Sequence, residues 1–303
     1  MLADRTQDSA QAAVLVARRR KPSISSSLIG FAVHKPLGAA GGIVVATAIV
    51  IAIFAPLLAP YDPQDIGVAV KFTAPFTAVQ LLGTDELGRD VLSRLIYGAR
   101  ISLTVGLVSV AIGIGLGTLI GIFSAYAGGK VDLVIQRITD ALMAFPAIIM
   151  ALALMAALGA FQKNVIVALV VILMPGAIRV IRSQVLSIKE LDYTLAARAI
   201  GANSVRVMLR HILPNVMATF IVLSTITLGY AIVVEASLSF LGVGIPPDIP
   251  SWGGMLNLGA ATYIEISPWL AIFPGVAIAV LVFAVNLLGD SLRDVLDPKL
   301  RGR

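Results

Sequence analysis

The sequence predicts an all-α, polytopic membrane protein with six transmembrane helices and both termini in the cytosol. Composition supports the first part of this prediction, because 58% of the 303 residues are hydrophobic and only 13% are charged. A soluble domain has about 25% charged residues. The mean hydropathy of +0.95 also indicates a chain that is surrounded mainly by lipid. The number of helices and their orientation follow from the apolar runs and from the distribution of Lys and Arg.

A helix needs about 20 apolar residues to cross the hydrocarbon core of a bilayer. Five runs have about this length and contain no charged residue: 37–59, 101–126, 141–161, 216–234 and 269–288. A sixth run, 165–181, contains Pro175 and Gly176 and has Arg179 near one end. This run could also be a re-entrant segment. We favour a span, because without it the loop at 182–215 would lie on the opposite side of the membrane from the basic N-terminal tail.

Six crossings place both termini on one side, and 18 of the 23 Lys and Arg residues fall on that side. The positive-inside rule therefore assigns it to the cytosol. The predicted organisation is a cytosolic tail at 1–36, a transmembrane domain at 37–290 and a cytosolic tail at 291–303. Within the domain we expect outer loops at 60–100 and 241–268 and a cytosolic loop at 182–215.

The remaining composition excludes several kinds of site and partner. There are no cysteines and only two histidines, which excludes disulfides, thiolate ligands and a His-rich metal site. The net charge of +6 reflects topology, since the basic residues are not gathered with aromatics as in a nucleic-acid-binding surface. The first apolar run starts at residue 37 and is longer than the core of a signal peptide, so we expect an uncleaved anchor helix.

In the first outer loop, residues 85–97 have the pattern of an amphipathic helix, with Thr84 or Asp85 as its N-cap. Its charged residues would form two i,i+4 pairs, Asp85–Arg89 and Asp90–Arg94. This helix could pack on the outer membrane face, or it could contact an external partner.

The loop at 190–215 is predicted to form a helix, a turn and a second helix. Asp192 can cap a helix that runs to Ala199, and Gly201 supplies the turn. Ser204 can cap the second helix, which we expect to end at Pro214, where the chain re-enters the membrane. Small residues at Ala196, Ala197 and Gly201 would form a face that another protein could approach closely. By spacing alone, an ordinary surface hairpin is the alternative.

The same loop resembles the "EAA" motif of ABC importer permeases, which has Glu-Ala-Ala, a Gly four residues later and a downstream Leu-Pro. The matching residues are Ala196, Ala197, Gly201, Leu213 and Pro214. Leu195 stands where the motif has Glu, so the capping-box carboxylate three residues after Asp192 is missing. The resemblance implies that this loop, including Ser204, docks a separate ATPase.

Other blocks extend the resemblance to the peptide/nickel group of these permeases, in particular to its DppC/OppC-like type. They are APLLAPYDP at 55–63, LGTDELGRDVLSRLIYGARISL at 82–103, SFLGVGIPPDIPSWGGML at 239–256 and the segment 268–298. The second block contains an outer-loop signature formed by Gly83, Thr84, Asp85, Gly88, Arg89 and Asp90. The resemblance implies the type I ABC importer permease fold in a bacterial inner membrane.

The resemblance also implies function and partners. The chain would translocate di- or oligopeptides, or a related cargo such as nickel complexes, together with a second, DppB/OppB-like permease. Two cytosolic ATPases would bind ATP-Mg, and a binding protein would dock outside. The chain itself has no catalytic, cofactor or metal site in this reading. It lacks G-x-x-x-x-G-K-[ST], since the nearest stretch, 124–130, has Ser at the first Gly position.

Two polar residues of the apolar runs are candidates for the translocation path. Glu235 follows the run 216–234 and could meet a peptide amino group, or it could lie at the outer interface and act only as a cap or pairing residue. Asn286 lies in the last run and could contact cargo, but polar residues at such positions more often bond neighbouring helices.

Three other classes compete with this interpretation. An ion-coupled secondary transporter needs intramembrane carboxylates or broken helices, and only Glu235 is a plausible ion ligand. An intramembrane enzyme would need a metal set or a nucleophile–base pair, and the runs contain neither. A structural anchor would leave the motif blocks unexplained.

Overall fold

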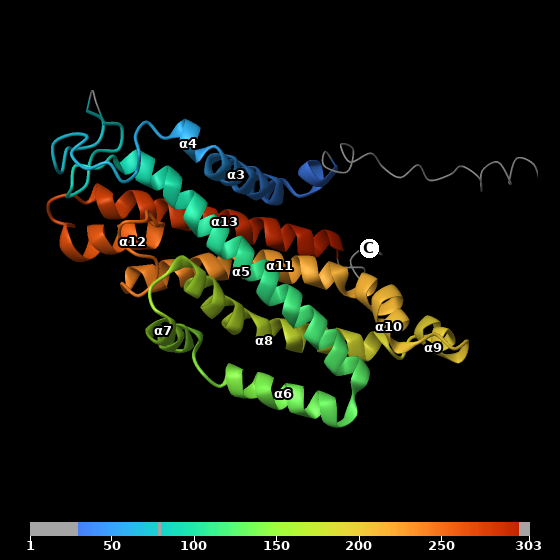
Figure 1. Ribbon diagram of the computed structural model, residues 1–303. Helices are drawn as coiled ribbons and strands as arrows, with labels where there is room; N and C mark the ends of the chain where they lie inside the picture. The colour runs from blue at the N-terminus through green and yellow to red at the C-terminus, as the bar shows by residue number, and fades with distance from the viewer. Residues whose placement is uncertain (1–29, 78–79, 297–303) are drawn as a thin grey trace, which may run out of the picture.

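The computed structural model describes residues 30–77 and 80–296, and the regular secondary structure of this part of the chain is helical (Figure 1). The elements are α3 (Pro36–Ile53), α4 (Ala55–Leu58), α5 (Val91–Ala127), α6 (Gly129–Met143), α7 (Ala147–Leu158), α8 (Gln162–Ile188), α9 (Asp192–Ala199), α10 (Ser204–Val207), the π segment η1 (Met208–Ile212), α11 (Leu213–Phe240), α12 (Trp252–Asn257), the π segment η2 (Leu258–Thr262) and α13 (Trp269–Leu296). Most of the predicted N-terminal tail (1–29) and the end of the C-terminal tail (297–303) lie outside the described residues. Helix α13 continues beyond residue 290, where the C-terminal tail was expected to begin.

Five helices in the described residues are long and apolar enough to cross a membrane: Pro36–Ile53, Val91–Ala127, Gln162–Ile188, Ser204–Phe240 and Trp269–Leu296. The third contains the run at 165–181, so the predicted helix is confirmed there and the re-entrant alternative is not supported. A sixth apolar unit consists of α6 and α7, which meet at an angle of 90°. The described residues therefore contain five straight candidates and one broken span or re-entrant loop.

Prolines break two of the predicted runs. The run at 141–161 is not one helix, because α6 ends at Met143 and α7 begins after Pro146. The run at 37–59 is interrupted at Phe54, just before Pro56. A proline has no N–H to donate and disfavours helical backbone in the preceding residue. By contrast, Pro175 and Pro274 lie inside α8 and α13.

Helix α5 is the central element. Its 37 residues span about 55 Å at 1.5 Å per residue, and it crosses the bundle diagonally in Figure 1. Helix α8 packs along one side of α5, and α11 and α3 pack on other parts of it. Helices α11 and α13 lie side by side, and α3 packs on α13 at the edge of the bundle.

A row of glycines allows α5 and α8 to approach closely. Gly113, Gly117 and Gly121 are spaced four residues apart on α5 and are buried. A Cβ atom added at Gly117 would lie 2.6 Å from the Ala177 Cβ, and one at Gly121 would lie 2.8 Å from the Ile178 carbonyl oxygen. This small-xxx-small spacing lets two membrane helices pack backbone against backbone. The G-x-x-x-G pattern that produces this contact is present in the sequence, but it was not among the features predicted above.

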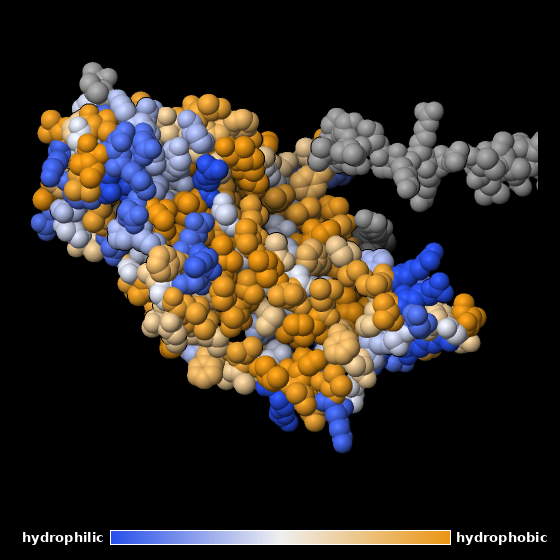
Figure 2. Space-filling view, viewed as in Figure 1, coloured by the Kyte–Doolittle hydropathy of each residue, from blue (hydrophilic) through white to orange (hydrophobic). Residues whose placement is uncertain are grey.

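The two ends of the bundle differ in polarity from its middle. In Figure 2 the middle of the visible face is largely hydrophobic, and hydrophilic side chains gather at both ends. One end, which we call the cap, consists of residues 59–77, 80–90 and 241–268; the other, the loop end, carries α9 and α10 (Figure 1). The middle exposes large apolar side chains, for example Leu37, Ile43 and Phe283. Such a belt suits lipid or another membrane-spanning chain.

We expect Gly117→Ala to destabilise the bundle by roughly 1–3 kcal/mol, the usual cost of overpacking a close contact. The matched control is Gly115→Ala on the same helix, because nothing lies within 4 Å of a Cβ atom added there. Both variants change helix propensity equally, so any difference reports packing. The melting temperature of each detergent-solubilised variant, monitored by size-exclusion chromatography after heating, measures this difference. Equal melting temperatures for the two variants would contradict the glycine contact.

Candidate functional site

The loop at 190–215 folds as two short helical segments around Gly201. Helix α9 begins at Asp192, with Leu191 as the N-cap residue and no side-chain cap. The prediction that Asp192 is the cap was therefore wrong by one residue; it lies in the first turn, where a carboxylate still favours the helix dipole. Gly201 has φ +85° and ends the helix in the left-handed conformation, as predicted. Ala202 N–H donates to the Ala197 carbonyl oxygen at 3.0 Å across this turn.

The second half of the loop differs from the prediction in two respects. Asn203, and not Ser204, caps α10, because its side chain accepts a hydrogen bond from Arg206 N–H at 2.8 Å. The helix does not end at Pro214 but continues through η1 into α11. Pro214 lies in the first turn of α11, where its missing N–H coincides with the change from π to α hydrogen bonding in η1.

The predicted small-residue face is divided between two sides of the loop. Ala197 is buried against the bundle, whereas Ala196 and Gly201 are exposed. The exposed side also carries Leu195, which is 43% exposed, and Ile200, which is 86% exposed. The loop therefore exposes the small residues Ala196 and Gly201 with apolar side chains beside them, and it has no acidic residue at position 195. Leu195, which stands where the motif has Glu, is part of this apolar surface, and the surface itself was not predicted from the sequence.

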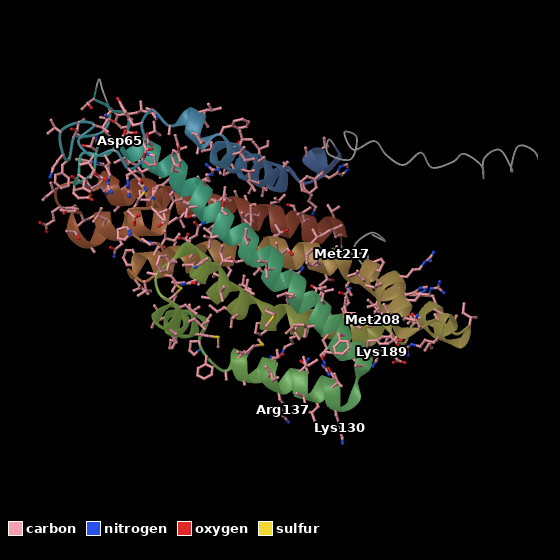
Figure 3. All side chains as sticks on the ribbon, viewed as in Figure 1. Asp65, Lys130, Arg137, Lys189, Met208 and Met217 are labelled. Atoms are coloured by element: carbon pink, nitrogen blue, oxygen red, sulfur yellow. The ribbon has the colours of Figure 1, made fainter. Side chains whose placement is uncertain are left out.

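Three contacts fix the base of the loop to the ends of α5 and α8. Thr194 Oγ1 donates to the Ile188 carbonyl oxygen at 3.0 Å, and Lys189 Nζ donates to the Ala125 carbonyl oxygen at 3.4 Å. The Arg198 guanidinium lies 5.0 Å from the centre of the Tyr126 ring. A buried apolar cluster joins the same ends to the start of α11; its members are Ile122, Ala125, Ile181, Val185, Ile188, Val207, Ile212 and Val216. Lys189 and Met208 mark the base of the loop in Figure 3. A force on the loop would therefore reach three long helices.

The outer-loop signature forms a turn in the cap and not the start of a helix. Helix α5 begins at Val91, and the predicted helix over 85–90 is wrong. Asp85 Oδ1 accepts hydrogen bonds from Leu87 N–H and Arg89 N–H, both at 2.9 Å, and these bonds close the turn. Gly88 has φ +73° within it. Thr84 pairs with Asp90 in an isolated bridge, and Gly83 also has a positive φ, +81°.

The charged residues of this turn are buried and pair with one another. The predicted Asp85–Arg89 pair is present, with Arg89 Nε 2.6 Å from Asp85 Oδ2, but the predicted Asp90–Arg94 pair is not. Asp90 Oδ2 instead accepts from Ser93 N–H at 2.7 Å and caps α5. Arg94 donates to the Pro63 carbonyl oxygen at 3.0 Å. These side chains thus connect the start of the cap to α5.

The carboxylate of Glu86, beside these ion pairs, has a hydrogen-bond partner for only one of its two oxygens among the described residues. Its Oε1 accepts from Arg89 Nη2 at 2.8 Å, whereas Oε2 is buried without a hydrogen-bond partner among the described residues. Burial raises the pKa of Glu86, and the neighbouring Asp85 carboxylate raises it further. The side chains of Asp85 and Glu86, together with Asp248, line a cavity of about 490 Å³ between the first segment of the cap and the segment 241–268.

Glu235 is enclosed within the bundle. Helix α11 continues to Phe240, so Glu235 does not end the span, and its side chain is fully buried. Glu235 Oε2 accepts from Ser102 Oγ of α5 at 2.9 Å, and Oε1 accepts from Ser239 Oγ at 3.0 Å. Within the described residues it forms no ion pair. In this conformation Glu235 acts as a pairing residue that links α11 to α5, and it is buried instead of exposed at the end of the helix.

Asn286 lies on the exposed side of α13 next to α11. A Cβ atom added at Gly229 of α11 would lie 3.3 Å from Asn286 Oδ1. Asn286 is thus at a helix contact, on a side open to a second chain or to a pathway. Asp140, the residue before the run at 141–161, lies in α6 and forms an ion pair with Arg179. The described residues contain no group of three or more His, Cys, Asp or Glu that could hold a metal ion.

Two family models match most of the chain. The model described as "binding-protein-dependent transport system inner membrane component" matches residues 117–302, and the model of the N-terminal transmembrane domain of oligopeptide transport permease C matches residues 33–75. The first match includes the α9–η1 loop, Glu235 and Asn286.

Curated relatives cover nearly the same region. The chain is 42% identical over 262 residues to a glutathione transport system permease protein, GsiD, of Pectobacterium atrosepticum, covering 86% of this chain and 87% of the relative. It is 42% identical over 270 residues to the di/tripeptide transport system permease protein DppC of Pseudomonas aeruginosa, with 87% and 89% covered. It is 39% identical over 265 residues to a dipeptide permease, DppC, of Alkalihalophilus pseudofirmus, with 88% and 86% covered.

Among solved structures, the fold is similar to a chain of the MetNI methionine ABC transporter in inward-facing conformations. The TM-score is 0.56 at 18% identity, and the match covers 67% of this chain and 96% of that chain. At this identity the similarity concerns the fold alone. The fold, the two family models and the relatives agree, and the chain belongs to the family of binding-protein-dependent transport system inner membrane components.

Proposed function

We propose that this chain is the DppC-type permease subunit of an ATP-driven importer of short peptides in a bacterial inner membrane. The chain is a permease component of the ABC importer family. In the proposed topology the chain crosses the membrane six times, with α6 and α7 as one broken span, and both termini lie in the cytosol. Its partners would be a second, related permease, two ATPases that bind ATP-Mg and an external binding protein.

The α9–η1 loop is the observation that carries the proposal. It projects from one end of the bundle, exposes Leu195 and Ile200, and is fixed at its base to the ends of three long helices (Figure 1). A rigid, apolar projection of this kind suits insertion into a groove of another protein. The loop lies at the end of the bundle to which the positive-inside rule assigns the cytosol, where an ATPase would bind.

The cargo class is taken from the relatives. Their names give dipeptides, di- and tripeptides and glutathione, which share a short peptide chain with free ionised ends. We therefore propose a small peptide as cargo.

Gly201→Val tests the loop as the coupling element. Valine at φ +85° costs about 1–3 kcal/mol in strained backbone, and each 1.4 kcal/mol is about a factor of ten in an equilibrium. We expect the number of peptides taken up per ATP hydrolysed to fall about tenfold in proteoliposomes. Gly159→Val is the matched control, because Gly159 has φ +88° but caps α7 away from the loop. Normal coupling in Gly201→Val would count against the docking loop.

Glu235→Gln separates the proposed importer from an ion-coupled transporter. A glutamine amide can replace both hydrogen bonds with Ser102 and Ser239, so we expect ATP-dependent uptake to stay within about twofold. Glu235→Leu leaves buried Ser102 unsatisfied and should lower the free energy of unfolding by roughly 1–3 kcal/mol. Loss of uptake in a stable Glu235→Gln protein would favour ion coupling through this carboxyl group.

A further inference from the structure

Helix α6 has its polar side turned toward the bundle and its apolar side turned outward. Asp132, Gln136 and Asp140 contact α5 or α8, whereas Leu133, Val134 and Ile138 are each more than half exposed. Lys130 and Arg137, seven residues apart, point away from the bundle in Figure 3. A surface helix of a soluble protein shows the opposite arrangement. The contacts that hold α6 in place are therefore mainly polar ones.

The first of these contacts is a bidentate ion pair. Arg182 of α8 donates from Nε and Nη2 to the two carboxylate oxygens of Asp132, at 2.7 and 2.6 Å. Ser124 Oγ of α5 donates to Asp132 Oδ1 at 2.5 Å, and Gln136 Nε2 donates to Ser124 Oγ at 3.1 Å. The Asp132 side chain is only 14% exposed, so this pair is less screened by water than a surface pair. Two parallel bonds also fix the orientation of the two helices.

A second ion pair lies two turns further along α6. Asp140 pairs with Arg179 of α8, and both side chains are about half exposed. Arg179 and Arg182 are three residues apart on α8, so one side of this helix provides both contacts. Two pairs separated along α6 prevent it from pivoting about either one. We call the two pairs together the clasp.

The clasp connects α6 to the helix that leads into the docking loop. Helix α8 ends at Ile188, three residues before α9, and Thr194 bonds back to the Ile188 carbonyl oxygen. The glycines of α5 hold the same part of α8 against α5, since Gly121 lies against Ile178 and Ile181. The loop, the end of α8, the end of α5 and α6 are therefore held together as one body.

Beyond the clasp, α6 ends at the 90° elbow at residues 144–146. Helix α7 on the far side of the elbow belongs to a different apolar cluster, in which Ala151 and Met155 pack with Val165 and Leu169 of α8. A cavity of about 200 Å³ lies next to the elbow, lined by Met143 at the end of α6, Phe145 of the elbow, Pro175 and Gly176 of α8, and Tyr230 of α11. The elbow thus has space beside it and lies next to Pro175 of α8, between the part of α8 at residues 165–169 that packs on α7 and the part at residues 179–182 that holds α6.

We infer that Asp132–Arg182 and Asp140–Arg179 make α6 a lever that carries motion of the ATPase-docking loop to the elbow, where residues 143–146 move relative to Tyr230 and gate the peptide pathway. This inference rests on the proposed function, because the motion would originate in the partner ATPases. The four charged residues are positioning residues; the elbow and Tyr230 would contact the cargo.

Two pairs of spin labels test the lever in the complex isolated from its own membranes through a tag on this chain. The chain has no cysteine, so introduced cysteines are its only labelling sites. Labels at Leu133 and Ser183 report the α6–α8 distance. Labels at Phe145 and Val233 report the distance between the elbow and α11, which we call the elbow distance. All four positions are exposed. Trapping with ATP and vanadate should change the elbow distance and leave the α6–α8 distance unaltered.

Variants of the clasp then test its role. In Asp132→Asn with Asp140→Asn, the elbow distance should no longer respond to trapping, and uptake should fall while the ATPases remain bound. Asp132→Arg with Arg182→Asp should restore part of the response by reversing the pair. Asp294→Asn is the matched control, because it breaks the Lys35–Asp294 ion pair outside the clasp. It should leave the response of both distances to trapping unaltered.

The outcomes separate the lever from the proposed function. A normal elbow response without the clasp, or an α6–α8 distance that changes on trapping in the wild type, would overturn the lever while uptake and bound ATPases remain. A wild-type complex that contains no ATPase would overturn the proposed function, and the lever with it.

Discussion

The close contact between α5 and α8 is the interaction on which the other elements depend. Gly113, Gly117 and Gly121 bring the two backbones together along much of their length, and a Cβ atom at Gly117 or Gly121 would collide with α8. In a bilayer the hydrophobic effect does not drive helices together, so packing of this kind supplies much of the association energy. Helix α5 extends from the cap to the loop end, and α8 leads into the α9–η1 loop. The pair thereby sets the distance between the cap and the loop end.

The two ends use their polar residues in opposite ways. At the cap, Asp85, Arg89 and Arg94 are buried and satisfy one another or backbone carbonyls, so that an irregular segment without regular secondary structure holds one conformation. At the loop end, polar contacts fix only the base, and the tip exposes Leu195 and Ile200. A closed network favours a fixed shape, whereas an exposed apolar tip favours a partner. This contrast fits the proposed function, in which cargo would enter at the cap and the ATPases would act on the loop end.

Three carboxylates of α6 and α11 have different surroundings. Glu235 has two hydroxyl partners and is sealed from solvent, while Asp132 and Asp140 have arginine partners at the edge of α8. A hydrogen bond from the Ser102 hydroxyl connects α5 to α11, and ion pairs connect α6 to α8. Because a charge that is removed from water is costly unless it is paired, the arginines of α8 account for the acidic residues of α6, whose outer side is apolar.

Hydropathy and charge distribution were sufficient to predict a helical membrane protein, the five long helices and the position of a helix, turn and helix at residues 192–213. These features depend on composition over some 20 residues or on a glycine that ends a helix, and both are local properties. The sequence did not determine where α5 begins, because Asp85 and Asp90 are equally good capping residues and only the packed cap selects Asp90. It did not reveal that Ala196 and Ala197 lie on different sides, or that 141–161 bends by 90° at Pro146, since Pro175 and Pro274 remain inside helices. Whether a proline breaks a membrane helix depends on what neighbouring helices offer to the freed carbonyl groups, and only the tertiary structure decided that.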